Sequence, residues 1–365
     1  MTTRQRARDL GITIGRLEPG RFDAITDVPG VRVGHVTRIE GSGKLVPGKG
    51  PIRTGVTAII PHDGDLFMEK VTATVHRING FGEVTNAEQV REMGFIEGPI
   101  LLTNTFNVAR VADAVIDWSL ERSAVQGIDT WGISPVVAET SDLWLNDIRG
   151  RHVNREHVFR AIDSAASGAV EEGAVGGGTG MICYDFKGGI GTASRKLPDQ
   201  LGGFTVGVLA QTNFGWRPQL MIDGAPIGRE LIDYEPLRRH NETPPESTRV
   251  VDGGSVIVVI ATDAPCSQRI LERLAMRAQN GLARTGSHTG NTSGDFVIAF
   301  STTRRKHHFN AALTYTIEQI AETNDLINHL FWSVVEATEE AVLNSLFKAD
   351  TMIGRDDRVV PGLPI

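Results

Sequence analysis

Short runs of β-branched residues, separated by glycine turns, constrain the fold of this chain more than any other feature. The runs that predict strands are Val31–Val36, Gly55–Ile60, Val71–His76 and Phe204–Ala210. Several have apolar or small residues at consecutive positions, which is typical of strands buried on both faces. Glycine makes up 41 of 365 residues, so we expect many tight turns and places where backbone comes close to other groups.

Amphipathic helices lie between and after these runs. They are predicted at Glu88–Met93, Val108–Leu120, 154–170, Ile270–Leu282 and Ile327–Ser345. We expect Asp263 to cap the fourth of these helices. Because strands and helices intermix without strict βαβ order, the pattern predicts a layered α/β or α+β fold.

Composition and charge narrow the class of protein. Apolar residues make up 40% and charged residues 22%, as in an ordinary globular protein. The net charge of -7 leaves no general basic field, so nucleic acid is not an expected partner. We expect no membrane span, because no run of about 18 uncharged apolar residues occurs. No apolar segment follows the basic N-terminus, so no secretory signal is expected either.

Cysteine usage indicates a reducing compartment and no metal. Cys183 and Cys266 are the two cysteines in the chain, and lone thiols suggest a cytoplasmic protein. No Cys/His spacing suggests zinc, so no metal is expected.

One boundary in the sequence is abrupt. Residues 236–254 are polar, contain adjacent prolines, and predict an exposed loop or linker. Gly254-Ser255 ends this segment, and the apolar run Val256–Ile260 follows at once. A serine at such a joint can become an N-terminal nucleophile once the bond before it is cut, because its own α-amine then serves as base. The unperturbed pKa of that amine, near 7.7–8.0, suits proton transfer at neutral pH.

Other motifs favour less specific interpretations. Gly43–Gly50 nearly matches a P-loop, but Gly50 stands where a magnesium-binding hydroxyl belongs, so we expect a polar loop. The glycines of 176–180 and 188–194 fail the dinucleotide fingerprint and indicate turns or a pocket lining. Four histidines could act as bases, but no Ser-Asp pattern organises them, and structural or surface roles are expected: His76, His288, His307 and His308.

The chain resembles a known family along most of its length. The segment Gly20–Val36 is similar to the opening of the self-processing L-aminopeptidase/D-esterases and β-aminopeptidases. Further matching segments, in order, are Gly55–Pro61, Asn79–Glu83, Gly98–Thr105, Pro135–Thr140, Leu145–Asp147, Gly177–Met181, Lys187–Thr192, Gly254-Ser255 and Ala261–Pro265. The ordered set covers nearly all of residues 10–350.

This resemblance implies a fold, an assembly and an activity. The fold is a four-layer α/β/β/α sandwich in a single domain spanning 1–365. Cleavage between Gly254 and Ser255 divides it into chains 1–254 and 255–365 that stay together, typically as a homotetramer of processed pairs. The implied enzyme is a serine aminopeptidase without metal or organic cofactor. It removes an N-terminal residue from small peptides, amides or esters through an acyl-enzyme on Ser255.

The resemblance also implies individual roles. Ser293 and Asp295 match a Ser/acidic pair that contacts the nucleophile and its amine, with Asp in place of the Glu of several relatives. Asn213 matches a donor to the oxyanion, and a preorganised amide is physically suited to that task. Glu139 matches a carboxylate that holds the free amine of the substrate. At Ser141 relatives often carry an aromatic residue, so the second oxyanion donor and the substrate stay open.

Two alternatives remain at this stage. An ornithine acetyltransferase-like enzyme has a related fold but a Thr nucleophile, which Ser255 argues against. A non-catalytic small-molecule-binding relative would keep the fold and remain one uncut chain. The preference for α- or β-residues, for L or D, and for amides or esters is not determined by the sequence.

Overall fold

The computed structural model describes residues 4–129, 132–234, 254–310, 312–323 and 325–365. A four-stranded sheet has the order β1-β2-β5-β6, and a six-stranded sheet has the order β4-β3-β12-β11-β10-β9. The strands of the first sheet are β1 (Arg32–Glu40), β2 (Ile52–Ile60), β5 (Ile100–Asn104) and β6 (Val136–Thr140). Those of the second are β3 (Glu69–Gly80), β4 (Phe95–Ile96), β9 (Gly189–Lys196), β10 (Thr205–Asn213), β11 (Gly254–Thr262) and β12 (Ser293–His307).

Six α-helices, two small hairpins and several short 3-10 helices lie outside the two sheets in the described chain. The helices are α1 (Ala87–Met93), α2 (Val108–Gln126), α3 (Arg155–Asp163), α4 (Ile227–Glu230), α5 (Gln268–Arg284) and α6 (Leu326–Phe347). The hairpins pair β7 (Ile182–Cys183) with β8 (Phe186–Lys187), and β13 (Met352–Ile353) with β14 (Val359–Val360). Among these described helices, none is long and apolar enough to cross a membrane.

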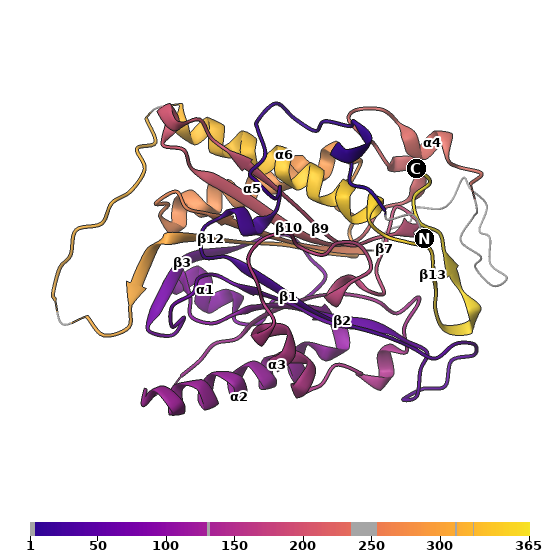
Figure 1. Ribbon diagram of the computed structural model, residues 1–365, viewed down its shortest axis with the longest axis horizontal. Helices are drawn as coiled ribbons and strands as arrows, with labels where there is room; N and C mark the ends of the chain where they lie inside the picture. The colour runs from indigo at the N-terminus through magenta and orange to yellow at the C-terminus, as the bar shows by residue number, and fades with distance from the viewer. Residues whose placement is uncertain (1–3, 130–131, 235–253, 311, 324) are drawn as a thin grey trace.

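The elements stack in four layers (Figure 1). Helices α5 and α6 cover one face of the six-stranded sheet, the four-stranded sheet packs on its other face, and α2 and α3 close the far side. Three buried apolar clusters fill the spaces between successive layers. This confirms the four-layer α/β/β/α sandwich that the resemblance implies.

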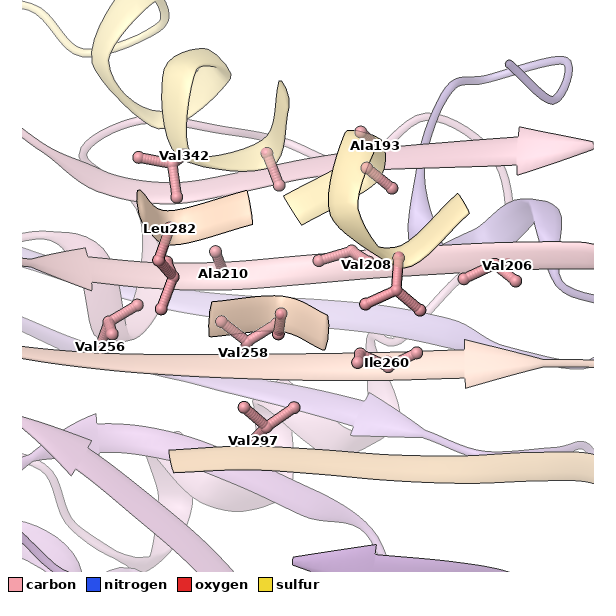
Figure 2. Packing of buried hydrophobic residues seen from close by; sticks show 14 of the residues in the cluster. Ala193, Val206, Val208, Ala210, Val256, Val258, Ile260, Leu282, Val297 and Val342 are labelled. Atoms are coloured by element: carbon pink, nitrogen blue, oxygen red, sulfur yellow. The ribbon is translucent and has the colours of Figure 1, made fainter. Parts of the chain in front are cut away.

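Strand β11 shows why the apolar run after Ser255 is continuous. Val256, Val258 and Ile260 belong to the cluster beneath α5 and α6, as Figure 2 shows. Ile257 and Val259 point the other way, into the cluster between the two sheets. Successive side chains of a strand face opposite sides, so a strand between two apolar layers needs apolar residues at every position. Each buried Val or Ile contributes roughly 1.5–3 kcal/mol relative to exposure.

The predicted strands all form, and two helix predictions need correction. Instead of reaching residue 170, α3 ends at Asp163, because Ala166 leaves the helical path to exchange both backbone hydrogen bonds with Val33 of β1. The cap of α5 is Ser267, whose hydroxyl accepts from the Ile270 amide. Asp263 instead accepts from the Thr205 amide, tying the end of β11 to the start of β10. Residues 235–253, most of the predicted loop, lie outside the described residues.

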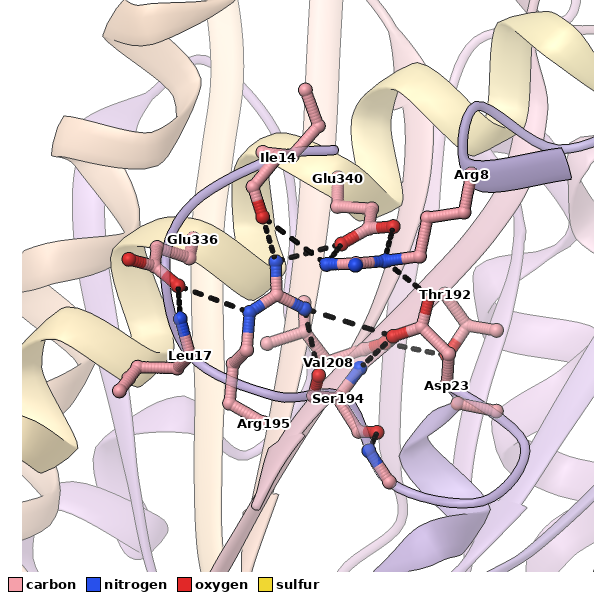
Figure 3. A network of polar contacts seen from close by, with 12 residues as sticks. Arg8, Ile14, Leu17, Asp23, Thr192, Ser194, Arg195, Val208, Glu336 and Glu340 are labelled. Carbon is pink, nitrogen blue, oxygen red and sulfur yellow. Dashed lines mark hydrogen bonds and ion pairs between the residues drawn. The ribbon is translucent and has the colours of Figure 1, made fainter. Parts of the chain in front are cut away.

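A buried network of charges joins the N-terminal segment, β9 and α6 (Figure 3). The guanidinium of Arg195 is fully buried and pairs with Glu336 at 3.1 Å and Glu340 at 2.7 Å. Arg8 binds the same Glu340 at 2.6 Å. The network therefore links residues that precede the Gly254-Ser255 bond to residues that follow it.

Candidate active site

Three neighbouring strands of the six-stranded sheet bring predicted site residues to one edge of it, the edge where β10 ends and β11 and β12 begin. Ser255 is the second residue of β11, and its side chain is buried. Strand β12 runs parallel to β11, so its first residues lie beside Ser255, with Gly294 directly opposite. Strand β10 is antiparallel to β11, so its last residue, Asn213, is the partner of Ser255 on the other side. Residues far apart in the sequence meet here because of strand direction and register.

The Asn213 side chain is held with its amide nitrogen toward the serine. Its Nδ2 lies 3.4 Å from Ser255 Oγ. Its Oδ1 accepts a hydrogen bond from the Ile182 backbone amide at 3.0 Å. Since the oxygen is occupied by a donor, the nitrogen must be the end that faces Ser255.

Ser293 and Asp295 form a pair on the same face of β12. Two positions apart in a strand, they point to one side, and Ser293 Oγ donates to Asp295 Oδ1 at 2.6 Å. Burial raises the pKa of Asp295 to about 6, although the Ser293 hydroxyl, the Val256 amide and His288 favour the charged form. Within the described chain, its other oxygen, Oδ2, is buried without a hydrogen-bond partner. A buried carboxylate with a free oxygen can accept a proton or bind a cation.

Glu139 approaches the same edge from the other sheet. It lies near the end of β6 and is buried, and its carboxylate accepts from the Thr105 hydroxyl and, at 3.3 Å, from the Glu83 amide. Burial raises the pKa of Glu139, with the nearby charges of Glu83 and Asp142 acting in the same direction. No cation pairs with this carboxylate among the residues that the structure describes.

Gly82 lies between Glu139 and the start of β12. A Cβ placed on Gly82 would lie 3.1 Å from Glu139 Oε1 and 3.0 Å from the Cα of Gly294. Gly294 is the register partner of Ser255. The loop after β3 therefore passes between the Glu139 carboxylate and the start of β12, with room at Gly82 for a hydrogen only.

Ser141 is not drawn into these contacts. It follows β6 directly and is exposed. Its hydroxyl has no hydrogen-bond partner in the described part of the chain, and a side chain of this size cannot stack on a substrate. The structure thus gives Ser141 no contact with Asn213 or Ser255.

The backbone at the predicted cleavage position is crowded. Gly254 has a φ of +155°, and a Cβ there would lie 2.8 Å from Phe214 Cα and 2.9 Å from the Asn213 carbonyl oxygen. Real Cβ atoms essentially never come so close to other atoms. Glycine at this position therefore lets β11 pass against the strand end that carries Asn213.

None of the four candidate histidines hydrogen-bonds to Ser255. His76 pairs with Glu272 at 2.6 Å, and His307 and His308 lie at the opposite end of β12. His288 is the one near the site: it is exposed, contacts Gln219 at 3.0 Å, and lowers the pKa of Asp295 electrostatically.

Two residues of this edge received no role from the sequence. The Asn79 amide nitrogen lies 3.0 Å from the Gly290 carbonyl oxygen and also reaches that of Ser293, so it holds the turn before β12. Thr105 orients the Glu139 carboxylate. Both stand in segments that match the family, Asn79–Glu83 and Gly98–Thr105, but the sequence did not show which group each one contacts.

Comparison with solved structures defines the class of protein. The L-aminopeptidase D-Ala-esterase/amidase of Ochrobactrum anthropi, described as a variant of the Ntn hydrolase fold, matches 98% of this chain and 95% of its own, with a TM-score of 0.86 and 40% identity. The PH0078 protein of Pyrococcus horikoshii OT3 matches 99% of this chain and 96% of its own, with a TM-score of 0.90 and 46% identity. Fold and site thus define an aminopeptidase with the Ntn hydrolase fold.

Sequence comparison then gives the family. The chain belongs to peptidase family S58, whose model matches residues 23–360. The beta-peptidyl aminopeptidase BapA of Sphingosinicella microcystinivorans is 46% identical over 362 residues, which cover 98% of this chain and 89% of that protein. This confirms the family identified from the sequence and favours the aminopeptidase over the acetyltransferase alternative.

Proposed function

We propose that this protein is a self-processing serine aminopeptidase that uses Ser255 first to cut its own chain and then to cut substrates. The observation that carries the proposal is the arrangement at one sheet edge. Ser255 is the second residue of β11, faces the amide of Asn213, and lies beside the start of β12, which carries the Ser293–Asp295 pair. A nucleophile, a donor for the oxyanion and a buried acid are the parts that acyl transfer requires.

Self-processing follows from attack of Ser255 Oγ on the Gly254 carbonyl carbon. The C–N bond to Ser255 breaks, the chain before it becomes an ester on Oγ, and the α-amine is released. Water then hydrolyses the ester, leaving chains 1–254 and 255–365. Asn213 stabilises the oxyanion of both steps through its Nδ2–H.

The released α-amine then acts in turnover. It takes the Oγ proton as Ser255 attacks the substrate carbonyl, and it returns the proton to the leaving amine. We propose that the Ser293 hydroxyl, which donates to Asp295, relays that proton. Water hydrolyses the acyl-enzyme and frees the N-terminal residue of the substrate.

Glu139 selects substrates with a free amine. Its buried carboxylate has no cation among the described residues, and a substrate ammonium supplies one. The named relatives act on β-peptides and on L-amino acid and D-Ala derivatives, so we propose small peptides, amides or esters with a free N-terminus as substrates. We propose that the processed pairs assemble as a homotetramer in the cytoplasm. Sedimentation of the purified protein tests the assembly.

Intact mass and N-terminal sequencing test self-processing. The wild type should give two fragments, the smaller beginning at Ser255, and Ser255→Ala should remain one inactive chain. An Ala variant that splits as the wild type does would mean that another protease makes the cut.

Glu139→Gln tests amine recognition. We expect KM to rise more than kcat falls, and acetylation of the substrate amine to abolish turnover. Glu272→Gln is the matched control, because Glu272 also accepts a threonine hydroxyl, from Thr74, but lies away from the site. Equal rates on free and acetylated substrates would remove Glu139 from this role.

His288→Ala tests the identity of the base. The α-amine needs no histidine, so this variant should keep substantial activity. A folded and processed His288→Ala protein without activity would make the histidine the base and contradict the proposal.

A further inference from the structure

A fully buried lysine next to the site has no carboxylate partner among the residues that the structure describes. Lys187 ends β8, and its Nζ donates to the carbonyl oxygens of Met181 and Gly188, each at 2.7 Å, and of Gly178 at 3.2 Å. These three acceptors match the three protons of an ammonium group. Burial lowers the pKa of Lys187 to about 7, because the charged form is disfavoured away from water.

The lysine connects to the nucleophile through two amide groups. The Met181 carbonyl that accepts from Lys187 belongs to the same peptide unit as the Ile182 N–H. That N–H donates to Asn213 Oδ1 at 3.0 Å, and Asn213 Nδ2 lies 3.4 Å from Ser255 Oγ. A continuous chain of hydrogen bonds therefore runs from the buried ammonium to the reacting atom.

Such a chain transmits charge. A cation at a carbonyl oxygen polarises the peptide unit and makes its N–H a stronger donor, and the next amide is polarised in turn. Polarisation of the Asn213 side chain strengthens Nδ2–H as a donor to an oxyanion. The effect grows when negative charge develops, which is when catalysis needs it.

A simple stapling role does not require the charge. The β7–β8 hairpin is already closed by backbone pairing, and the Gly188 amide donates to the same Met181 oxygen at 3.2 Å. The neighbouring thiol of Cys183 provides no negative partner, because burial raises its pKa to about 12. A charged lysine is thus not needed to close this loop.

We propose that Lys187 is a positioning residue that acts through the Met181–Ile182 peptide. It orients and polarises the Asn213 amide toward the oxyanion that forms when Ser255 attacks a carbonyl group. The inference rests on the proposed function, in which Ser255 is the nucleophile. It assigns a task to a buried cation that the acyl-transfer steps themselves leave unused.

The test uses Lys187→Gln, which keeps hydrogen-bond donors but removes the charge, and Lys187→Met, which removes both. Lys70→Met is the control, because Lys70 is also a buried lysine in a strand, β3, but is paired with Glu97. Each variant is purified, checked for folding by thermal melting, and assayed for self-cleavage rate, kcat and KM. Affinities for an α-aminoalkyl boronic acid, whose serine adduct carries an oxyanion-like oxygen, and for the free amino acid product are measured in parallel.

We expect Lys187→Gln to lower kcat about tenfold, equivalent to about 1.4 kcal/mol on the barrier, while KM changes little. Boronic acid affinity should fall in step with kcat, and product affinity should not. In an Asn213→Ala background the same substitution should have almost no further effect. Lys70→Met should change stability without this pattern.

Two results would overturn the inference. One is an equal loss of boronic acid and product affinity in Lys187→Gln, which marks general damage. The other is a Lys187→Gln effect that persists undiminished without Asn213. If Lys187→Met fails to fold, the Gln variant alone decides. Failure of the proposed function is seen separately, as an active Ser255→Ala enzyme.

Discussion

Replacing Gly254 by Ala should delay self-processing while leaving the mature enzyme nearly intact. The new methyl group would lie 2.8 Å from Phe214 Cα, 2.9 Å from the Asn213 carbonyl oxygen and 3.0 Å from Phe214 Cβ, where ordinary contacts begin at 3.4 Å. Two of these atoms are backbone, so they cannot rotate away. Either β11 or the end of β10 must move, and both carry groups that meet at the scissile bond.

The cost can be set against known strain energies. Backbone held in a sparsely populated conformation costs about 1–3 kcal/mol, and the φ of +155° adds to the contact. If that strain appears in the transition state of cleavage, the rate falls roughly fivefold to 150-fold. After cleavage the residue becomes a chain end that can move aside, so turnover by processed molecules should approach that of the wild type.

A time course of intact mass measures the cleavage rate, and active-site titration gives kcat per processed molecule. Gly98→Ala is the control, because an added Cβ there meets no atom within 4 Å. Wild-type cleavage kinetics in Gly254→Ala would refute the steric reasoning. A large loss of kcat in the processed fraction would show that residue 254 still acts in the mature site.

Three further predictions concern the acid pair and the buried charges. Ser293→Ala should lose at least about tenfold in kcat if the Ser293 hydroxyl relays the proton. Ser301→Ala removes a buried hydroxyl of the same strand and should not cause this loss. Comparable kcat values for the two variants in a steady-state assay would exclude the relay. Arg195→Met should lower the free energy of unfolding by about 3–5 kcal/mol, because it leaves Glu336 and Glu340 buried without this partner. Arg155→Met, at the surface, should lower it by less than about 1 kcal/mol in the same denaturant titration. In the uncut Ser255→Ala protein the pKa of Asp295 is raised from 3.8 to about 6, so the folded chain binds this proton more tightly than the unfolded chain. Between pH 4 and 6, the free energy of unfolding should therefore fall with rising pH by up to about 1.4 kcal/mol per pH unit, relative to that of Ser255→Ala/Asp295→Asn. The same pH dependence of thermal stability in both proteins would contradict this.

Local patterns in the sequence were sufficient for the strands and for the candidate nucleophile. The apolar run Val256–Ile260 predicts a strand, and it lies in β11, which is buried on both faces. Its junction with Gly254-Ser255 is visible without a structure, because a change from polar loop to apolar strand is a property of adjacent residues. The resemblance supplied the four layers and the candidate residues around Ser255.

Local patterns failed where a distant segment competed. The apolar stripe of residues 154–170 predicts a helix to the end, but pairing of Ala166 with Val33 ends it at Asp163. Asp263 has the chemistry of a helix cap, yet the amide of Thr205 takes its carboxylate. At both positions a hydrogen bond to a distant backbone group outweighed the local preference.

The sequence by itself determined which side chains are available: a serine before a buried strand, an Asn at a strand end and a Ser/Asp pair two positions apart. Only the tertiary structure decided how they act together. Strand direction and register set Asn213 opposite Ser255, and the Ile182 amide turned the Asn213 side chain toward the Ser255 hydroxyl. Gly82 lies between Gly294 and Glu139, which comes from the other sheet. These relations are hydrogen bonds and close contacts between residues far apart along the chain, and such pairings leave no periodic trace in the sequence.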